Sequence, residues 1–133
     1  MNMSEESLEI MIKKDYIDNA GIISVDSDDI MTIRDSCDFI DGCKRTCYAK
    51  EMKDNLKSGL DELLEMHSGE SFSHLAVKLL VNKESEFIIH GLSAISNVAE
   101  SFSDVEIYWG VAKNYDSQNG KVAICIVCGF KRV

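Results

Sequence analysis

Two strongly apolar stretches, residues 74–81 and residues 122–130, limit the folds open to this chain of 133 residues. Their sequences are His-Leu-Ala-Val-Lys-Leu-Leu-Val and Val-Ala-Ile-Cys-Ile-Val-Cys-Gly-Phe. A strand with one face in water alternates apolar and polar residues, whereas a strand covered on both faces is apolar almost throughout. Both stretches therefore predict buried strands, the first of them central in a sheet.

Four other segments carry apolar residues at helical spacing. The clearest begins at residue 47 and has charged residues on its other face; its apolar residues are Tyr48, Met52, Leu56, Leu60, Leu63 and Leu64. Gly59 lowers the stability of that helix by up to about 1 kcal/mol relative to Ala, so we expect a neighbour to pack closely there. The other helices are predicted over residues 8–17 (with Ser4 or Ser7 as the cap), 27–36 and 88–102.

The remaining segments complete the predicted order of elements. A weak strand is expected over residues 36–42, followed by a turn at 42–46. A further strand covers 105–111, and a hairpin loop at 114–120 ends in Asn-Gly. The chain then reads helix, acidic loop, helix, strand, helix, strand, helix, strand, strand. This order predicts an α/β (α+β) two-layer sandwich, with helices packed on a mixed sheet of about four strands.

Composition restricts the classes of function. The length suits one domain. A net charge of -9 argues against nucleic-acid binding, because phosphate contacts require clustered Lys and Arg. No apolar run approaches the roughly 20 residues that span a bilayer, and the acidic start is not a secretory signal. We therefore expect a cytoplasmic protein, in which the five cysteines are reduced thiols.

The cysteines offer one candidate metal site. Cys43 and Cys47, together with Cys125 and Cys128, could supply four thiolates to zinc. However, residues three apart in a strand point to opposite faces, and cysteine is among the most buried residue types. We therefore expect small core thiols and no metal.

Other catalytic patterns are weak. His67, His74 and His90 have no Cys or acid at ligand spacing, and no local pattern favours a Cys–His nucleophilic pair. The glycines are isolated, without a Gly-rich phosphate-binding motif. We therefore expect that this chain alone binds no nucleotide and no other cofactor.

The acidic segment at residues 21–30 is the strongest candidate site. It passes from an apolar triplet into Asp26, Asp28 and Asp29 and then into the second helix. One interpretation is a solvated loop in which Asp26 or Ser27 caps that helix. A calcium loop would need more oxygen ligands at fixed spacing. The other interpretation is a loop that presents carboxylates to a partner.

The same segment resembles the synergy loop of the FtsZ/tubulin family. Residues 21–33 read Gly-Ile-Ile-Ser-Val-Asp-Ser-Asp-Asp-Ile-Met-Thr-Ile, similar to the FtsZ pattern Gly-Leu-Ile-Asn-Val-Asp-Phe-Ala-Asp-Val-x-Thr-Val. Residues 79–82 look like its Val-Leu-Ile-Asn strand end, and residues 107–111 like its Ile-Ile-Phe-Gly-Ala strand. Residues 122–130 look like its Val-Thr-Val-Ile-Ala-Thr-Gly-Phe ending. The match is poor over residues 36–50.

The resemblance implies the C-terminal, activation-type domain of that family without the N-terminal GTP-binding domain. Residues 1–20 would be the end of the central connecting helix, and residues 21–133 the domain itself. In the family this domain does not bind GTP. Its loop enters the nucleotide pocket of the next subunit, where its acids orient the water that attacks the γ-phosphate.

Carried over by position, Asp26 and Asp29 match the two catalytic acids of the family, which would act in trans. Ser24 stands where FtsZ has Asn, and its shorter hydroxyl cannot make both amide contacts. Ser27 and Asp28 replace Phe-Ala, which makes the loop more acidic. Ser24, Asp26, Asp28 and Asp29 together would form the partner-binding set.

These observations lead to three hypotheses. The first is a stand-alone domain, not an enzyme by itself, that binds an FtsZ/tubulin-type GTPase protomer and regulates polymer assembly or GTP hydrolysis in cell division. GTP would be bound only by the partner. The second is a split half or fragment of an FtsZ-like GTPase that pairs with the missing N-terminal half. The third is an α/β sandwich for binding or homo-oligomerisation without a role in a filament.

Overall fold

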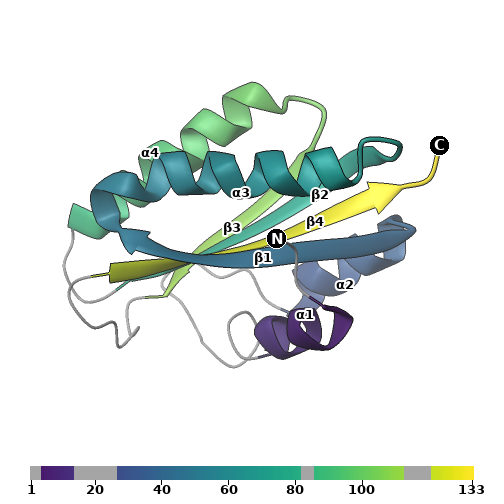
Figure 1. The fold of residues 1–133 in the computed structure, drawn as a ribbon, viewed down its shortest axis with the longest axis horizontal. Helices are drawn as coiled ribbons and strands as arrows, with labels where there is room; N and C mark the ends of the chain where they lie inside the picture. The colour runs from purple at the N-terminus through teal and green to yellow at the C-terminus, as the bar shows by residue number, and fades with distance from the viewer. Residues whose placement is uncertain (1–3, 14–26, 82–85, 113–120) are drawn as a thin grey trace.

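The computed structural model describes residues 4–13, 27–81, 86–112 and 121–133 (Figure 1). There the chain forms a mixed four-stranded sheet with helices packed on it, which confirms the predicted fold class. The elements in chain order are α1 (Glu5–Met11), α2 (Ser27–Ser36), β1 (Phe39–Tyr48), the 3-10 turn η2 (Ala49–Glu51), α3 (Met52–Met66), β2 (Ser71–Leu80), α4 (Glu86–Ser101), β3 (Glu106–Ala112) and β4 (Lys121–Lys131).

The two apolar stretches form the two central strands of the sheet. The strand order is β1-β4-β2-β3. β4 is antiparallel to both of its neighbours, whereas β2 and β3 are parallel and are joined through α4. Every residue of β4 from 122 to 130 is buried. The sequence prediction of buried strands at these positions is confirmed.

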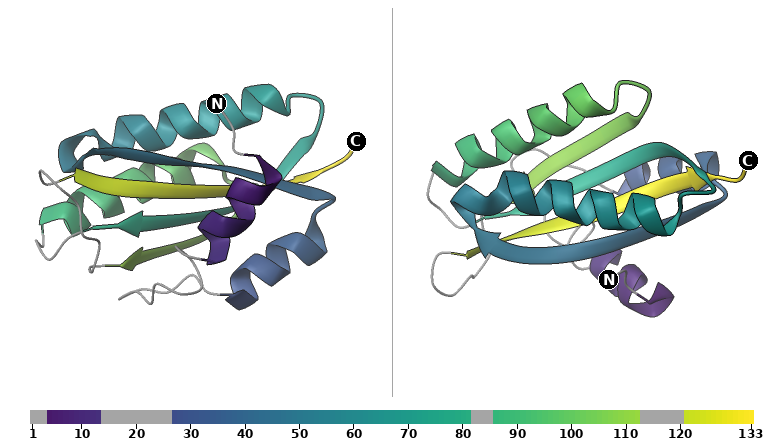
Figure 2. Two further views of the ribbon diagram at one scale, coloured as in Figure 1. Left: turned by 60° about the horizontal axis from the view of Figure 1, so that its bottom comes forward. Right: turned by 45° about the horizontal axis from the view of Figure 1, so that its top comes forward.

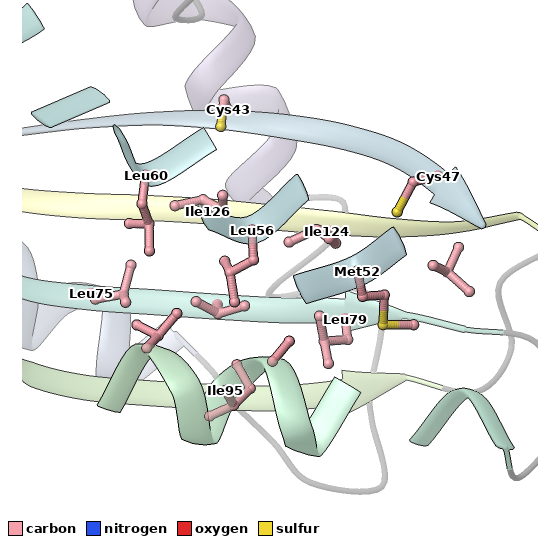
Figure 3. Packing of buried hydrophobic residues seen from close by; sticks show 14 of the residues in the cluster. Cys43, Cys47, Met52, Leu56, Leu60, Leu75, Leu79, Ile95, Ile124 and Ile126 are labelled. Atoms are coloured by element: carbon pink, nitrogen blue, oxygen red, sulfur yellow. The ribbon is translucent and has the colours of Figure 1, made fainter. Parts of the chain in front are cut away.

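Helices cover both faces of the sheet. α3 and α4 lie on one face, and α1 and α2 lie on the other (Figures 1 and 2). The larger core fills the space under α3 and α4 (Figure 3); it includes Leu56, Leu60, Leu75, Ile124 and Ile126. The smaller core lies under α1 and α2; it includes Leu8, Ile30, Ile33, Ala76 and Val127. Alternate residues of β2 and β4 enter the two cores, as the period of a strand requires.

The region around Gly42 differs from the prediction. Instead of a turn at 42–46, β1 continues through Tyr48 and pairs with β4 over its whole length. The polar residues that suggested a turn are tolerated because β1 is an edge strand. Gly42 is required for close approach: an added Cβ would lie 2.5 Å from the Ile126 carbonyl oxygen and 2.8 Å from Leu8 Cδ1.

The predicted hairpin between the last two strands is wrong. β3 lies beside β2 at the edge of the sheet, and β2 separates it from β4. The apolar composition of β4 explains this arrangement, because a place between β1 and β2 gives it a neighbour on each side. The loop itself, residues 113–120, lies outside the described residues.

α1 agrees with the sequence at its start. The Ser4 side chain accepts a hydrogen bond from the Ser7 backbone N–H at 3.2 Å and is the N-cap of the helix. Leu8, Met11 and Ile12 are buried against the sheet. The predicted division of the chain at residue 20 lies outside the described residues and stays a prediction.

Gly59 supports the expectation of close packing on α3. A Cβ at this position would lie 2.8 Å from Ile126 Cδ1 and 3.2 Å from Cys43 Sγ. We predict that Gly59→Ala destabilises the fold by about 1–2 kcal/mol, because overpacking outweighs the gain in helix propensity. Urea unfolding would measure the change. Ser58→Ala, exposed on the same helix, is the matched control and should leave stability equal or slightly higher. Equal stability of the two variants would contradict the prediction.

Three buried thiols make the fold sensitive to alkali. Burial, followed by the charge of Glu51, raises the pKa of Cys47 from 9.0 to about 11. Burial also raises the pKa of Cys43 and of Cys128. A thiol with a raised pKa holds its proton in the folded chain after the unfolded chain has lost it. Its contribution to stability is therefore complete below pH 9 and is lost as the pH rises toward 11.

We predict that the free energy of unfolding of the reduced protein falls between pH 9 and pH 11, and that it falls less steeply in Cys47→Ala. Urea unfolding at several pH values would measure both slopes. The variant starts from a lower stability because it leaves a small cavity, so the slopes are compared and not the absolute values. The same slope in both proteins would contradict a role for Cys47.

Candidate functional site

The acidic segment leads into the first turn of α2. Ser24 and Asp26 lie outside the described residues. Asp28 is exposed and Asp29 is partly exposed, and both belong to the first turn of the helix. Carboxylates are favoured there because the N-terminal end of a helix carries a partial positive charge. Two of the four predicted partner-binding residues are thus placed at an accessible helix start.

The opposite side of α2 fixes the helix on the sheet. Ile30 and Ile33 are buried in the smaller core, as the sequence predicts. Arg34, near the end of α2, forms an ion pair with Glu9 of α1. The anchored apolar side and the partly exposed acids give this short helix a defined orientation.

Asp29 lies close enough to Tyr108 of β3 to affect the ionisation of its hydroxyl. The pKa of Tyr108 is raised by burial first, then by the charge of Glu106 and a hydrogen bond to it, and finally by the charge of Asp29. A raised pKa keeps the phenol protonated, so it donates to Glu106. The first turn of α2 and the beginning of β3 therefore belong to one polar region.

The same region contains an arrangement that sequence reasoning missed. His74 Nε2 lies 3.0 Å from Glu106 Oε2. His74 Nδ1 lies 2.8 Å from Ser73 Oγ and 3.3 Å from Cys37 Sγ. The parallel register of β2 and β3, which places His74 opposite Glu106, brings the acid to the imidazole. No local motif signals these contacts; only the pairing of these two strands could have indicated them.

A cavity of about 530 Å³ opens near the start of β1. Its lining is both polar and apolar and comes from α1, α2, β1 and the end of α3; it comprises Glu5, Leu8, Glu9, Arg34, Cys37, Asp38, Phe39, Ile40, Asp41 and His67. Cys37 is thus part of the cavity wall, and the carboxylates of the wall outnumber its single arginine.

One wall of this cavity is a pair of polar side chains, the buried Asp41 and the partly buried His67. His67 Nε2 lies 2.7 Å from Asp41 Oδ2, and Asp41 Oδ1 accepts a hydrogen bond from the Gly42 backbone N–H at 2.8 Å. The His67 ring packs on Phe130 and Phe39, with centroid distances of 4.5 and 5.0 Å. His67 is thus a histidine with a carboxylate partner, and the ring packing fixes its position.

The four cysteines of the zinc hypothesis do not converge. Cys43, Cys47 and Cys128 belong to the core under α3 and α4, whereas Cys125 belongs to the core on the opposite face. All four are buried and free of disulfides. Among the described residues, no group of three or more His, Cys, Asp or Glu side chains could hold a metal ion. The expected core thiols are therefore present.

None of the helices in the described parts of the chain is long and apolar enough to cross a membrane.

Comparison with known proteins gives a match at the level of structure. No protein-family model and no curated protein sequence matches the chain. An empty FtsZ dimer from M. jannaschii matches at a TM-score of 0.64 and 15% identity, over 93% of this chain and 41% of the FtsZ chain. A tryptophan-to-tyrosine mutant of the same FtsZ matches at a TM-score of 0.68 and 14% identity, over 99% of this chain and 46% of that chain.

These matches extend over nearly all of this chain but less than half of each FtsZ chain. The mixed four-stranded sheet and its helices agree with the fold that the resemblance of residues 21–33 and 122–130 implies. The chain therefore has the fold of an FtsZ C-terminal domain.

Proposed function

We propose that this chain is an FtsZ-type C-terminal domain that binds an FtsZ-like GTPase protomer through its acidic segment. Its effect is on polymer assembly or on GTP hydrolysis in the partner. In this proposal the chain supplies carboxylates, the partner supplies the nucleotide site, and the domain is not an enzyme by itself. The contact residues we assign are Ser24, Asp26, Asp28 and Asp29.

The match to FtsZ over 93–99% of the chain is the observation that carries this proposal. One of the matching structures is an FtsZ dimer, so FtsZ protomers associate with each other. By analogy, we infer that a domain with this fold takes part in the same kind of association. Two acids, Asp28 and Asp29, lie at the accessible first turn of α2, within the segment that resembles the synergy loop and the helix after it.

Carboxylates suit the proposed task. They accept hydrogen bonds from water and attract cations, and a water positioned beside a γ-phosphate needs such an acceptor. The first turn of α2 stabilises the negative charge of Asp28 and Asp29 through the helix dipole. The buried Ile30 and Ile33 hold this turn at a fixed place on the domain. Asp28 and Asp29 are thus held in position before any partner binds.

We predict that the purified domain, added in excess to a polymerising FtsZ from the same organism, changes GTP turnover and light scattering. Asp26→Ala combined with Asp29→Ala should remove most of the effect, because the two carboxylates matched to the family are lost. A pull-down with the same proteins would measure binding directly. No change in turnover, scattering or binding at excess domain would overturn the proposal.

A matched control separates the acidic segment from general charge effects. Asp54→Ala combined with Asp61→Ala also removes two negative charges, from exposed positions on α3. α3 lies on the opposite face of the sheet from α2 (Figure 2). This variant should keep the full effect on the polymerising GTPase. Equal loss in both double variants would indicate a nonspecific electrostatic effect.

The coverage of 41–46% of the FtsZ chains favours a second candidate function. Here the chain is one half of a two-part GTPase and pairs with a nucleotide-binding half. We predict that mixing the two halves restores GTP hydrolysis and that Asp29→Ala abolishes it, because the attacking water loses an acceptor. The Asp61→Ala variant, with one exposed acid removed from α3, should hydrolyse GTP normally. Hydrolysis unaffected by Asp29→Ala would contradict the assignment of that acid.

A further inference from the structure

The cluster around His74 has the geometry of a base-activated nucleophile. A nucleophilic thiol needs a base within hydrogen-bond reach, and the base needs a third group that orients it. Cys37 Sγ lies 3.3 Å from His74 Nδ1, and Glu106 Oε2 lies 3.0 Å from His74 Nε2. The three residues come from the segment after α2, from β2 and from β3. This cluster has no part in the proposed binding by the acidic segment.

The hydrogen bonds determine which nitrogen is the base. Glu106 accepts from Nε2–H, so the neutral imidazole carries its proton there and presents the lone pair of Nδ1 to both the Ser73 hydroxyl and the Cys37 thiol. When the thiol proton moves to Nδ1, the carboxylate of Glu106 stabilises the imidazolium that forms. His74 is buried, and its two hydrogen bonds are stronger there because water competes less for the same groups.

Ser73 stabilises the other product of that proton transfer. Its Oγ lies 2.8 Å from His74 Nδ1 and 3.3 Å from Cys37 Sγ. After the transfer, the hydroxyl and the Nδ1–H can both donate to the thiolate. Hydrogen bonds to an ion are stronger than those between neutral groups. The cluster therefore offers two hydrogen-bond donors to the sulfur after the proton has moved.

The sulfur is held in place by a close approach to the backbone. A Cβ at Gly129 would lie 2.5 Å from Cys37 Sγ and 3.2 Å from His74 Cβ. Only a residue without a side chain lets Cys37 lie over β4 beside His74. The same added Cβ would lie 2.8 Å from Ile33 Cγ2, so the buried Ile33 also packs closely on Gly129. Cys37 as a whole is partly exposed.

The cavity at the start of β1 lies beside Cys37. Cys37 is one of its lining residues. The other charged groups on its wall are Glu5, Glu9, Asp38 and Asp41, against the single cation Arg34, which is paired with Glu9. An anionic substrate is repelled from such a wall, whereas a small uncharged electrophile is not. The charges on the cavity wall therefore favour a small uncharged electrophile as the reactant.

The other four cysteines provide an internal contrast. Cys43, Cys47, Cys125 and Cys128 are buried in the two cores. Burial raises the pKa of three of them, which keeps them as unreactive thiols at neutral pH. Cys37 differs in its exposure, its base and its access to a cavity.

We propose that Cys37 is a nucleophilic thiol, with His74 as its base and Glu106 as a positioning residue, that is oxidised by hydrogen peroxide to a sulfenic acid. The thiol proton passes to His74 Nδ1, and the thiolate attacks one peroxide oxygen. An S–O bond forms as the O–O bond breaks, and the leaving hydroxide takes the proton from His74 as water. Sulfur is oxidised, peroxide is reduced, and the products are Cys37 sulfenic acid and one water.

The test is the rate at which peroxide converts Cys37 to a form that dimedone labels, followed by mass spectrometry of the intact chain and its peptides. Wild-type protein should be labelled at Cys37 at least about tenfold faster than free cysteine at neutral pH. The buried cysteines should remain unlabelled until the chain is unfolded. Labelling of Cys37 no faster than free cysteine would overturn the proposal without any variant.

Variants test the two supporting residues. His74→Asn removes the base and should lower the rate at least about tenfold. Glu106→Gln should also lower it, and Glu106→Asp, which restores the carboxylate, should recover part of the loss. Glu100→Gln, an exposed acid of α4, is the matched control and should react like the wild type. Because the Glu106 side chain is 60% exposed, its variants should fold even if His74→Asn does not. An unchanged rate in Glu106→Gln would remove Glu106 from the mechanism.

Discussion

The burial of β4 between β1 and β2 is the constraint on which both faces of the molecule depend. Nine consecutive residues of this strand are buried. Its side chains alternate between the core under α3 and α4 and the core under α1 and α2. At about 25 cal/mol for each Å² of apolar surface buried, one such strand contributes a large part of the hydrophobic stabilisation. Exposure of either face would remove that stabilisation, so both pairs of helices are needed.

Glycines determine how closely the helices approach this strand. Gly42 on β1 leaves room for Leu8 of α1, and Gly59 on α3 leaves room for Ile126. Gly129 on β4 leaves room for Ile33 and for Cys37. The sulfur can therefore reach His74 only because the same close packing that holds α2 on the sheet also brings the end of α2 down to β4. The packing of α2 on the sheet and the contact between Cys37 and His74 therefore both depend on Gly129.

The sequence was most informative where one physical effect dominated. The buried strands and the long amphipathic helix α3 followed from periodicity and composition, because burial alone determines those patterns. β1 was misjudged because an edge strand tolerates polar residues and because Gly42 serves close approach and not a turn. The predicted hairpin failed because strand order depends on which neighbours bury β4 best, and local turn residues do not encode that choice.

In the candidate sites, too, local features could be predicted from the sequence and contacts between distant residues could not. Asp28 and Asp29 could be located at the start of a helix because capping and apolar spacing are local signals. The contacts among Cys37, His74 and Glu106 could not be predicted, because they join positions 37 and 32 residues apart through the register of β2 with β3. The sequence alone argued against the zinc site, because residues three apart in a strand, such as Cys125 and Cys128, lie on opposite faces.

The two polar sites are connected through α2 and β3. α2 has ten residues, about 15 Å in length, with the acids in its first turn and Cys37 directly after its last residue. On β3, Tyr108 feels the charge of Asp29 and donates to Glu106, which in turn holds His74. Neutralising Asp29 would remove one of the charges that raise the pKa of Tyr108. The acidic turn and the thiol therefore share an electrostatic environment, although they lie at opposite ends of one helix.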